Sequence, residues 1–326
     1  PFAKDEDVRD NRLYFYDLNL KFSHVLDNAN RLYFSGYSGR DTFKNEFALF
    51  GFGNRTASLR WNHLFSGKLF SNMSLMYSKY DYALGTPEGD VTSFTWDSKM
   101  YDYSARFDLT HYISGSHTLK YGATTTWHTI YPGSARGEGS GSAFTDFILP
   151  AQHALEHSLY LSDEFRVSGR FSLKYGVRLA LFQNIGPGTY YNYDEEYNPI
   201  DSTVYGGGDI FNTYANPEPR IAFTFLIDDA SSIKGSYSHT AQYLNLAQNS
   251  TAGTPLDIWF PASPNVKPQI CDQFSAGYFR NFANNMFETS AEVYYKDFDR
   301  VIDFRDHAQL LLNQYLEGEI RTGEGY

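Results

Sequence analysis

The sequence has few of the features that hold small secreted domains together or attract nucleic acid. It contains a single cysteine, Cys271, among 326 residues, which excludes a disulfide framework within the chain. Basic residues are in the minority, with 27 Lys and Arg against 38 Asp and Glu and a net charge of -11. No basic footprint of the kind that binds a phosphate backbone is present, so we expect no nucleic-acid partner.

Long apolar runs are also missing. No stretch reaches the roughly 20 apolar residues of a transmembrane helix, and the first residues lack the charged, apolar and small-residue regions of a signal peptide. Even so, 42% of the residues are hydrophobic and 18% are aromatic, enough to bury a large core in one or two domains. If this chain meets a membrane, we expect it to do so with strands.

Two-residue alternation, by contrast, is abundant and is clearest in residues 159–182. Apolar side chains occupy the odd positions of 159–167, with Asp163 as the exception, and again the odd positions of 171–181. A three-residue turn with glycine, 168–170, separates the two arms. This pattern predicts a β-hairpin with one wide apolar face, which must be buried against another sheet or against lipid.

The same pattern recurs along the chain. Comparable hairpins are predicted in residues 13–37, 56–82, 101–131, 219–243 and 271–298. Together with the first they give about twelve strands, and no segment has convincing helical periodicity. The sequence therefore predicts an all-β, antiparallel up-and-down meander.

The connections alternate strictly between two kinds. Short turns are predicted at 27–30, 66–67, 114–116, 168–170, 228–231 and 283–285, and long polar loops at 36–54, 83–96, 132–153, 186–217 and 246–269. Strict alternation places every short turn at one end of the sheet and every long loop at the other. Transmembrane β-barrels of the outer membrane have this asymmetry.

Strand length and aromatic placement favour the same architecture. Many arms exceed ten residues, longer than the usual five to six of soluble strands, and the apolar stripe carries rings toward both ends. Phe65, Phe171, Tyr175, Phe282 and Phe287 lie near the turns, whereas Tyr77, Tyr103, Trp127 and Tyr243 lie toward the loops. Two aromatic girdles are typical of a bilayer interface. We therefore predict a transmembrane antiparallel β-barrel in contact with lipid; a soluble sandwich or propeller, with shorter strands, fits less well.

The opposite face of the strands is rich in charge and would look into a lumen. The candidates for lumen-facing residues are Arg60, Arg106, Glu164, Lys174, Arg178 and Arg220. They could line a polar channel or bond to a plug inside it. The simpler alternative is that they satisfy one another across strands, as Glu164 and Lys174 would if 167 pairs with 171.

The long loops hold the candidate ligand-binding residues. Segment 190–199, YYNYDEEYNP, clusters tyrosines around acids, and rings with hydrogen-bonding tips suit ligand capture. The loop predicted at 246–269 adds Trp259 and Asp257. The candidates are Tyr190, Tyr191, Tyr193, Trp259 and Asp257; alternatively, these loops simply pack on one another.

Motifs for chemistry are weak. His128, His153 and His157 flank one loop without the spacing typical of a metal site, and no acidic segment has the spacing of a calcium loop. No pair of carboxylates is placed for acid-base work. We expect no enzyme activity, no metal site and no cofactor.

Residues 217–304 closely resemble the barrel of TonB-dependent outer-membrane transporters of the Bacteroidetes type. The resemblance rests on PRIAF, SSIKGSYS, TPLDIWFP followed by NVKPQ, DQFSAGYFRNF and EVYYKDF; upstream it is one of architecture and spacing. It implies a barrel of 22 strands, of which about twelve are present here. It also implies a location in the Gram-negative outer membrane and uptake of an external ligand, whether siderophore, glycan, peptide or vitamin.

The resemblance also implies partners beyond lipid and ligand: a TonB motor, contacted through an N-terminal region missing here, and a surface lipoprotein as a lid. We expect residues 1–326 to form a partial barrel domain, since a plug domain and final C-terminal strands are not recognisable. Transport would then belong to a longer protein. Two alternatives remain open: a passive pore or surface-binding barrel without energy coupling, and a soluble all-β binding protein.

Overall fold

The computed structural model describes residues 11–45, 47–86, 91, 93–138, 143, 145–247, 258–310 and 312–326. Nearly all of the regular structure is β-strand, with a single turn of 3-10 helix at η1 (Leu316–Glu319) among the described residues. Within these ranges no helix has the length and apolar character needed to cross a membrane.

Twelve long strands form the body of the structure, and each pairs antiparallel with the next long strand in sequence. Short β7 (Phe147–Ile148) adds to β6, and β18 (Ile320–Gly325) adds to one end of β17. The predicted antiparallel meander of twelve strands is confirmed. The long strands are β1 (Arg12–Val25), β2 (Asn30–Lys44), β3 (Leu49–Ser66), β4 (Leu69–Gly85), β5 (Phe94–Tyr112), β6 (His117–Gly137), β8 (Gln152–Arg166), β9 (Phe171–Ile185), β12 (Ile210–Asp228), β13 (Ser231–Gln242), β16 (Gln269–Phe282) and β17 (Phe287–Phe304).

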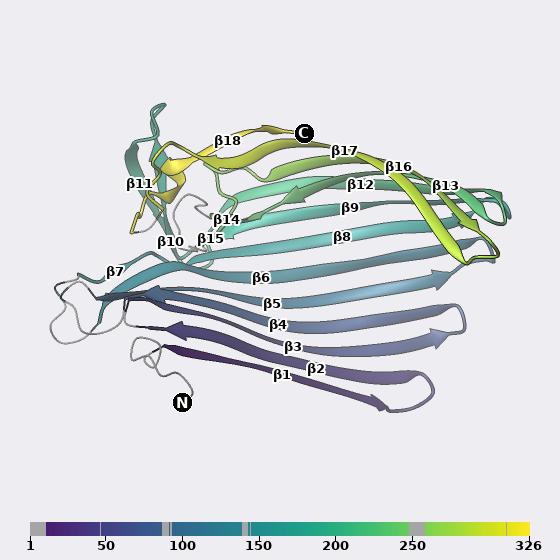
Figure 1. The fold of residues 1–326 in the computed structure, drawn as a ribbon, viewed down its shortest axis with the longest axis horizontal. Helices are drawn as coiled ribbons and strands as arrows, with labels where there is room; N and C mark the ends of the chain where they lie inside the picture. The colour runs from purple at the N-terminus through teal and green to yellow at the C-terminus, as the bar shows by residue number, and fades with distance from the viewer. Residues whose placement is uncertain are drawn as a thin grey trace.

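The six short turns all lie at one end of the sheet, at the right in Figure 1, and the long connections lie at the other end. Four of the five predicted loops, 36–54, 83–96, 132–153 and 186–217, were too long, because the strands run further than expected. The connection predicted as 36–54 is only the gap between Lys44 and Leu49, and β12 already begins at Ile210 rather than after 217. Segment 186–217 also contains a small hairpin of its own, formed by β10 (Gly188–Tyr193) and β11 (Pro199–Tyr205).

The register separates the strands into two faces. Leu161 lies opposite Val177, whereas Glu164 lies opposite Lys174, because residues directly opposite each other share a face of the sheet. On the first face the large apolar side chains are exposed, as with Leu161 at 52% and Val177 at 49%. We call this the outer face. A soluble domain rarely exposes such a continuous apolar surface to water. A sheet that faces lipid is expected to have one.

The other face, which we call the inner face, is covered near the long-loop end. The chain leaving β13 turns back over the sheet, and β15 (Ile258–Pro261), paired with β14 (Leu244–Ala247), contacts β5, β6 and β8. One buried cluster joins Ala180 and Phe182 of β9 to Tyr243 and Ala262, and the rings of Phe182 and Tyr243 stack with centroids 4.9 Å apart. The prediction that Tyr243 belongs to the lipid-facing aromatic girdle was therefore wrong.

A second buried cluster lies beside it on the inner face. It brings Trp96, fully buried, against Ile258 and Phe260 of β15 and against Ile320 at the start of β18. Gly133 of β6 lies so close to the Trp96 ring that an added Cβ would fall 1.8 Å from it, so only glycine fits there. These contacts fix the loops that form the candidate site.

Candidate ligand site at the long-loop end

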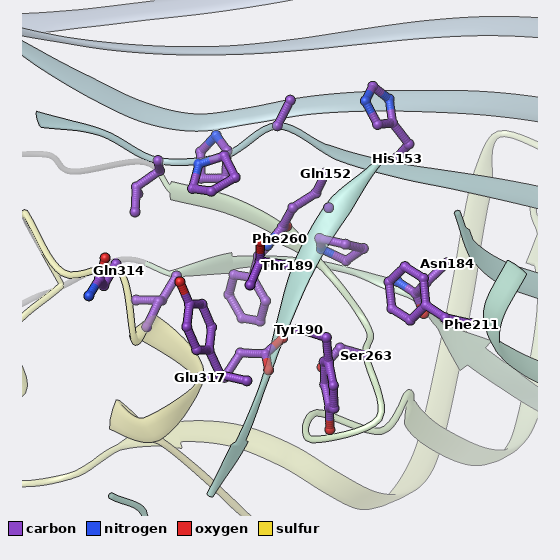
Figure 2. Close-up of a pocket in the computed structure, with 18 of the residues that line it drawn as sticks. Gln152, His153, Asn184, Thr189, Tyr190, Phe211, Phe260, Ser263, Gln314 and Glu317 are labelled. Carbon is purple, nitrogen blue, oxygen red and sulfur yellow. The ribbon is translucent and has the colours of Figure 1, made fainter. Parts of the chain in front are cut away.

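Four segments distant in sequence meet around a cavity at the long-loop end. They are residues 149–153 at the start of β8, residues 187–193 with β10, residues 260–263 at the end of β15, and residues 313–317 at the start of η1. The cavity has a volume of about 90 Å³. Figure 2 shows Gln152, Tyr190, Ser263 and Glu317 around it.

Asn265 ties three of these segments together. Its side-chain oxygen accepts a hydrogen bond from the Tyr190 hydroxyl at 2.6 Å, and its Nδ2 donates to the Tyr191 carbonyl at 2.9 Å. The same Nδ2 lies 2.5 Å from Oε2 of Glu317. One amide thereby connects the hairpin, the segment after β15 and the C-terminal segment.

The three predicted tyrosines all line this cavity. Tyr191 packs its ring edge-on against Tyr315, with centroids 5.0 Å apart. An added Cβ on Gly318 would lie 2.9 Å from the Tyr193 ring, so this ring sits directly on the glycine. Burial raises the pKa of both Tyr190 and Tyr193 above the usual value of 10, so their hydroxyls stay protonated and can donate hydrogen bonds.

The lining also offers acceptors. Oε1 of Gln152 is buried and has no hydrogen-bond partner among the described residues. Burial raises the pKa of Glu317 above its usual value. Neither Lys nor Arg is found among the described residues that line the cavity. The cavity therefore suits a neutral or cationic group that donates hydrogen bonds better than it suits an anion.

The volume limits what can enter. At about 90 Å³ the cavity is small for a ligand pocket. Ligand pockets commonly enclose about 300–1,000 Å³. Only a terminal group of a larger ligand could fill this cavity, with the remainder lying over the rim.

The other two candidate ligand-binding residues, Trp259 and Asp257, are not among the described residues that line the cavity. The residues that follow Trp259 in the chain, Phe260 and Pro261, do line it. The indole nitrogen of Trp259 is buried without a partner among the described residues. Asp257 lies outside the described residues. Sequence reasoning missed Gln152, Asn265 and Glu317, and no local signal marks them, since Asn265 and Tyr190 are 75 residues apart.

The six charged candidates share the inner face, below the cavity. The strand register shows this, because directly opposed residues share a face: Arg60 lies opposite Ser74, and Ser74 lies opposite Arg106. The predicted pair of Glu164 and Lys174 is present, with 3.1 Å between Oε1 and Nζ, and Lys120 also contacts Glu164 at 2.7 Å. Cross-strand pairing thus accounts for part of this charge.

A longer chain of charges follows on β5 to β12. His128 contacts Asp102 at 2.8 Å, and Arg178 contacts Glu156 at 2.9 Å and Glu218 at 3.7 Å. Arg220 contacts Glu218 at 3.3 Å from the next position on the same face. Within the described ranges no three His, Cys, Asp or Glu residues are grouped so that they could hold a metal ion.

Glu317 gives the loop end a testable pH dependence. Burial raises the pKa of Glu317. The Glu317 carboxyl therefore holds its proton more tightly when residues 313–319 are docked on the other loops than when they are free. Docking should be strongest below the ordinary glutamate pKa and should weaken as pH rises through the raised value. We expect Glu317→Gln to remove this dependence, measured as hydrogen exchange of the amides of 313–319 between pH 4 and 7.5. Glu324→Gln, at an exposed position of β18, is the matched control; an unchanged profile in Glu317→Gln would contradict the assignment.

The fold and its two faces define a class: an antiparallel sheet, apolar outside and polar inside, with the asymmetric connections of an outer-membrane barrel. The family follows from comparison. Residues 2–322 match the family described as TonB dependent receptor-like, beta-barrel, so the chain belongs to that family. Barrels of this family are outer-membrane proteins that take part in ligand uptake.

Solved structures agree on the fold. The chain is similar to the copper transporter OprC, with a TM-score of 0.66 and 11% identity over 91% of this chain and 47% of that one. It is similar to BauA, the ferric preacinetobactin receptor from Acinetobacter baumannii, with a TM-score of 0.60 and 14% identity over 92% and 49%. The third is the hemophore receptor HasR from Serratia marcescens, solved with HasA and heme, with a TM-score of 0.62 and 13% identity over 90% and 47%.

At these identities the likeness establishes the fold alone. The chain spans about half the length of the solved structures that it matches. No curated protein matches the sequence.

Proposed function

We propose that this chain forms part of the barrel of an outer-membrane receptor that takes up an external ligand. The long-loop end captures the ligand, and the inner face lines the path behind it. The observation that carries the proposal is the cavity shared by Tyr190, Tyr191 and Tyr193, held by Asn265 at the long-loop end of a sheet whose inner face is polar. Loops on a rigid sheet meet an external ligand before any residue of the inner face can.

The lining favours one part of the range of ligands. OprC is a copper transporter, BauA is a receptor for ferric preacinetobactin, and HasR is a receptor solved with a hemophore and heme, so the ligands of these relatives differ. Here the cavity presents the Gln152 and Glu317 oxygens and tyrosine hydroxyls without Lys or Arg among its described lining. We therefore favour a glycan hydroxyl or a peptide amine as the group that enters it, over an anionic chelate.

Energy coupling is the second part of the proposal. The inner face carries cations that are still half exposed, with side-chain exposure of 59% for Lys174 and 55% for Arg220. Such groups can contact a plug domain inside the barrel. The complete receptor would then depend on a TonB motor, as expected for the family.

Uptake by living cells tests the function. Cells that carry the complete receptor are given fluorescent neutral oligosaccharides, cationic peptides and ferric siderophores, with and without a protonophore that collapses the proton gradient. We expect accumulation of a sugar or peptide that stops with the protonophore. Accumulation that persists would make the barrel a passive pore, and uptake of siderophores alone would refute the favoured ligand class.

Removing the Tyr191 ring is expected to weaken capture of that ligand about tenfold. The ring faces the cavity and could contribute about 1–3 kcal/mol on burial against a ligand, and about 1.4 kcal/mol is one decade in affinity. The change is Tyr191→Ala, followed by equilibrium titration of the complete receptor. Trp259→Ala is titrated beside it, because we propose that the site extends over β15 only if this change weakens binding too. Unchanged affinity in both variants would move the site to the inner face or the plug.

A further inference from the structure

A different feature lies on the outer face of β5 and β6, away from the ligand cavity. Two hollows follow one another along these strands, one above and one below the ring pair of Tyr103 and Trp127, which lie directly opposite each other. Tyr77 extends this girdle onto β4, with its ring centroid 5.4 Å from that of Tyr103.

The hollow toward the short turns is apolar. It has a volume of about 890 Å³. Small side chains of β5 and β6 line it together with larger apolar ones. The small residues are Ala105, Ala123 and Thr125, and the larger ones include Leu75, Phe107 and Leu159.

The hollow toward the long loops is polar and aromatic, with a volume of about 540 Å³. Lys99, Tyr101, Tyr131 and Arg136 line it, together with the carboxylate of Asp97. Lys99 and Arg136 form no ion pair with any carboxylate of the described part of the chain. The neighbouring cations are already engaged, because Arg40 and Lys79 both contact Asp81, at 2.7 and 2.9 Å.

The two hollows have complementary chemistry along one line. From Lys99 to Ala105 is six residues of β5, about 20 Å at 3.3 Å per residue. That is the scale of a lipid, with its headgroup above the girdle and an acyl chain below it. We infer that the outer face of β5 and β6 binds one outer-leaflet lipid with a phosphorylated headgroup, its phosphate at Lys99 and Arg136 and an acyl chain over Ala105 and Ala123.

The inference rests on the membrane location of the barrel but not on ligand uptake. Cations above an aromatic girdle meet the headgroup layer, where phosphate is the available counter-ion. Tyrosine hydroxyls beside them can donate to the same phosphate. A free phosphate ion would need the upper hollow only, so the requirement for both hollows separates the two sources.

Native mass spectrometry of the complete receptor in neutral detergent provides the test, with diphosphorylated lipid A as the probe. We expect Lys99→Gln with Arg136→Gln to weaken binding about thirtyfold. Two cations near the headgroup contribute about 2 kcal/mol together, and about 1.4 kcal/mol is one decade in affinity. Ala105→Leu, which fills the apolar hollow, should also weaken it. The control for charge is Lys68→Gln with Arg170→Gln at the exposed short turns, and the control for volume is Ala291→Leu on the outer face of β17.

Two further arms identify the source. The same lipid without phosphates should bind wild type as weakly as intact lipid A binds the double variant, and millimolar inorganic phosphate should not displace lipid A. If the charge variant and the volume variant both remain folded and bind lipid A as tightly as wild type does, the inference is overturned. Displacement by inorganic phosphate, or loss with Ala291→Leu as large as with Ala105→Leu, would overturn it as well.

Discussion

Replacing Val177 by arginine is expected to destabilise the folded barrel in a bilayer by about 2–4 kcal/mol, the cost of a cation on the lipid face near the midplane. Val177 lies on the outer face, opposite Leu161 on β8. It is six residues from Phe171, at the short-turn end of β9, and six from Gln183, which lies at the level of Leu155 and of the Trp127 girdle. An arginine there has no water and no carboxylate opposite it.

The matched change places the same charge on the inner face. Ser236 is exposed there, and its hydroxyl is 2.7 Å from that of Ser275 on β16. Ser236→Arg can reach water and should cost less than about 1 kcal/mol, as polar surface changes usually do. The measurement is a urea titration of the complete receptor in lipid vesicles. Equal losses from both changes would mean that the apolar face does not contact lipid.

The strands were predictable because their signal is local. Period-two alternation and a turn containing glycine are read within about 20 residues, and the turns at 168–170 and 228–231 join strands as predicted. The strand ends were not. Beyond the girdles both faces of a strand meet water, so the alternation fades while the backbone pairing continues, as from Tyr37 opposite Thr56 to Lys44 opposite Leu49.

The candidate site was predictable only in its tyrosines, which composition and loop position indicated. Their neighbours depend on how three loops dock. Asn265 holds Glu317 from 52 residues away, and Gln152 reaches the cavity from the start of β8. No periodicity connects such positions, because contacts between loops are set by side-chain packing over the sheet and not by the strand repeat. Trp259 shows how far the sequence could predict the site. It was predicted to bind ligand, but the next residue in the chain, Phe260, lines the cavity instead.

Glu218 carries the second large expected effect. It is only 2% exposed, and its carboxylate accepts contacts from Arg220 at 3.3 Å, from Arg178 at 3.7 Å and from the Ala241 amide at 3.3 Å. Glu218→Ala removes the shared acceptor. Breaking a buried pair by deleting one partner costs about 3–5 kcal/mol, but the side chains of Arg178 and Arg220 are 34% and 55% exposed and can be hydrated. We expect a loss of about 2 kcal/mol in the free energy of unfolding.

A graded series distinguishes the carboxylate from its partners. Glu218→Gln keeps an acceptor for the Ala241 amide while losing the charge, so it should cost less than Glu218→Ala. Arg220→Gln should cost least, because Glu218 still has Arg178 and because the Arg220 side chain is more than half exposed. Urea titration of the complete receptor gives the order, and hydrogen exchange at Ala241 reports the local bond. If Arg220→Gln costs as much as Glu218→Ala, the charge pair and not the buried acceptor stabilises this part of the inner face.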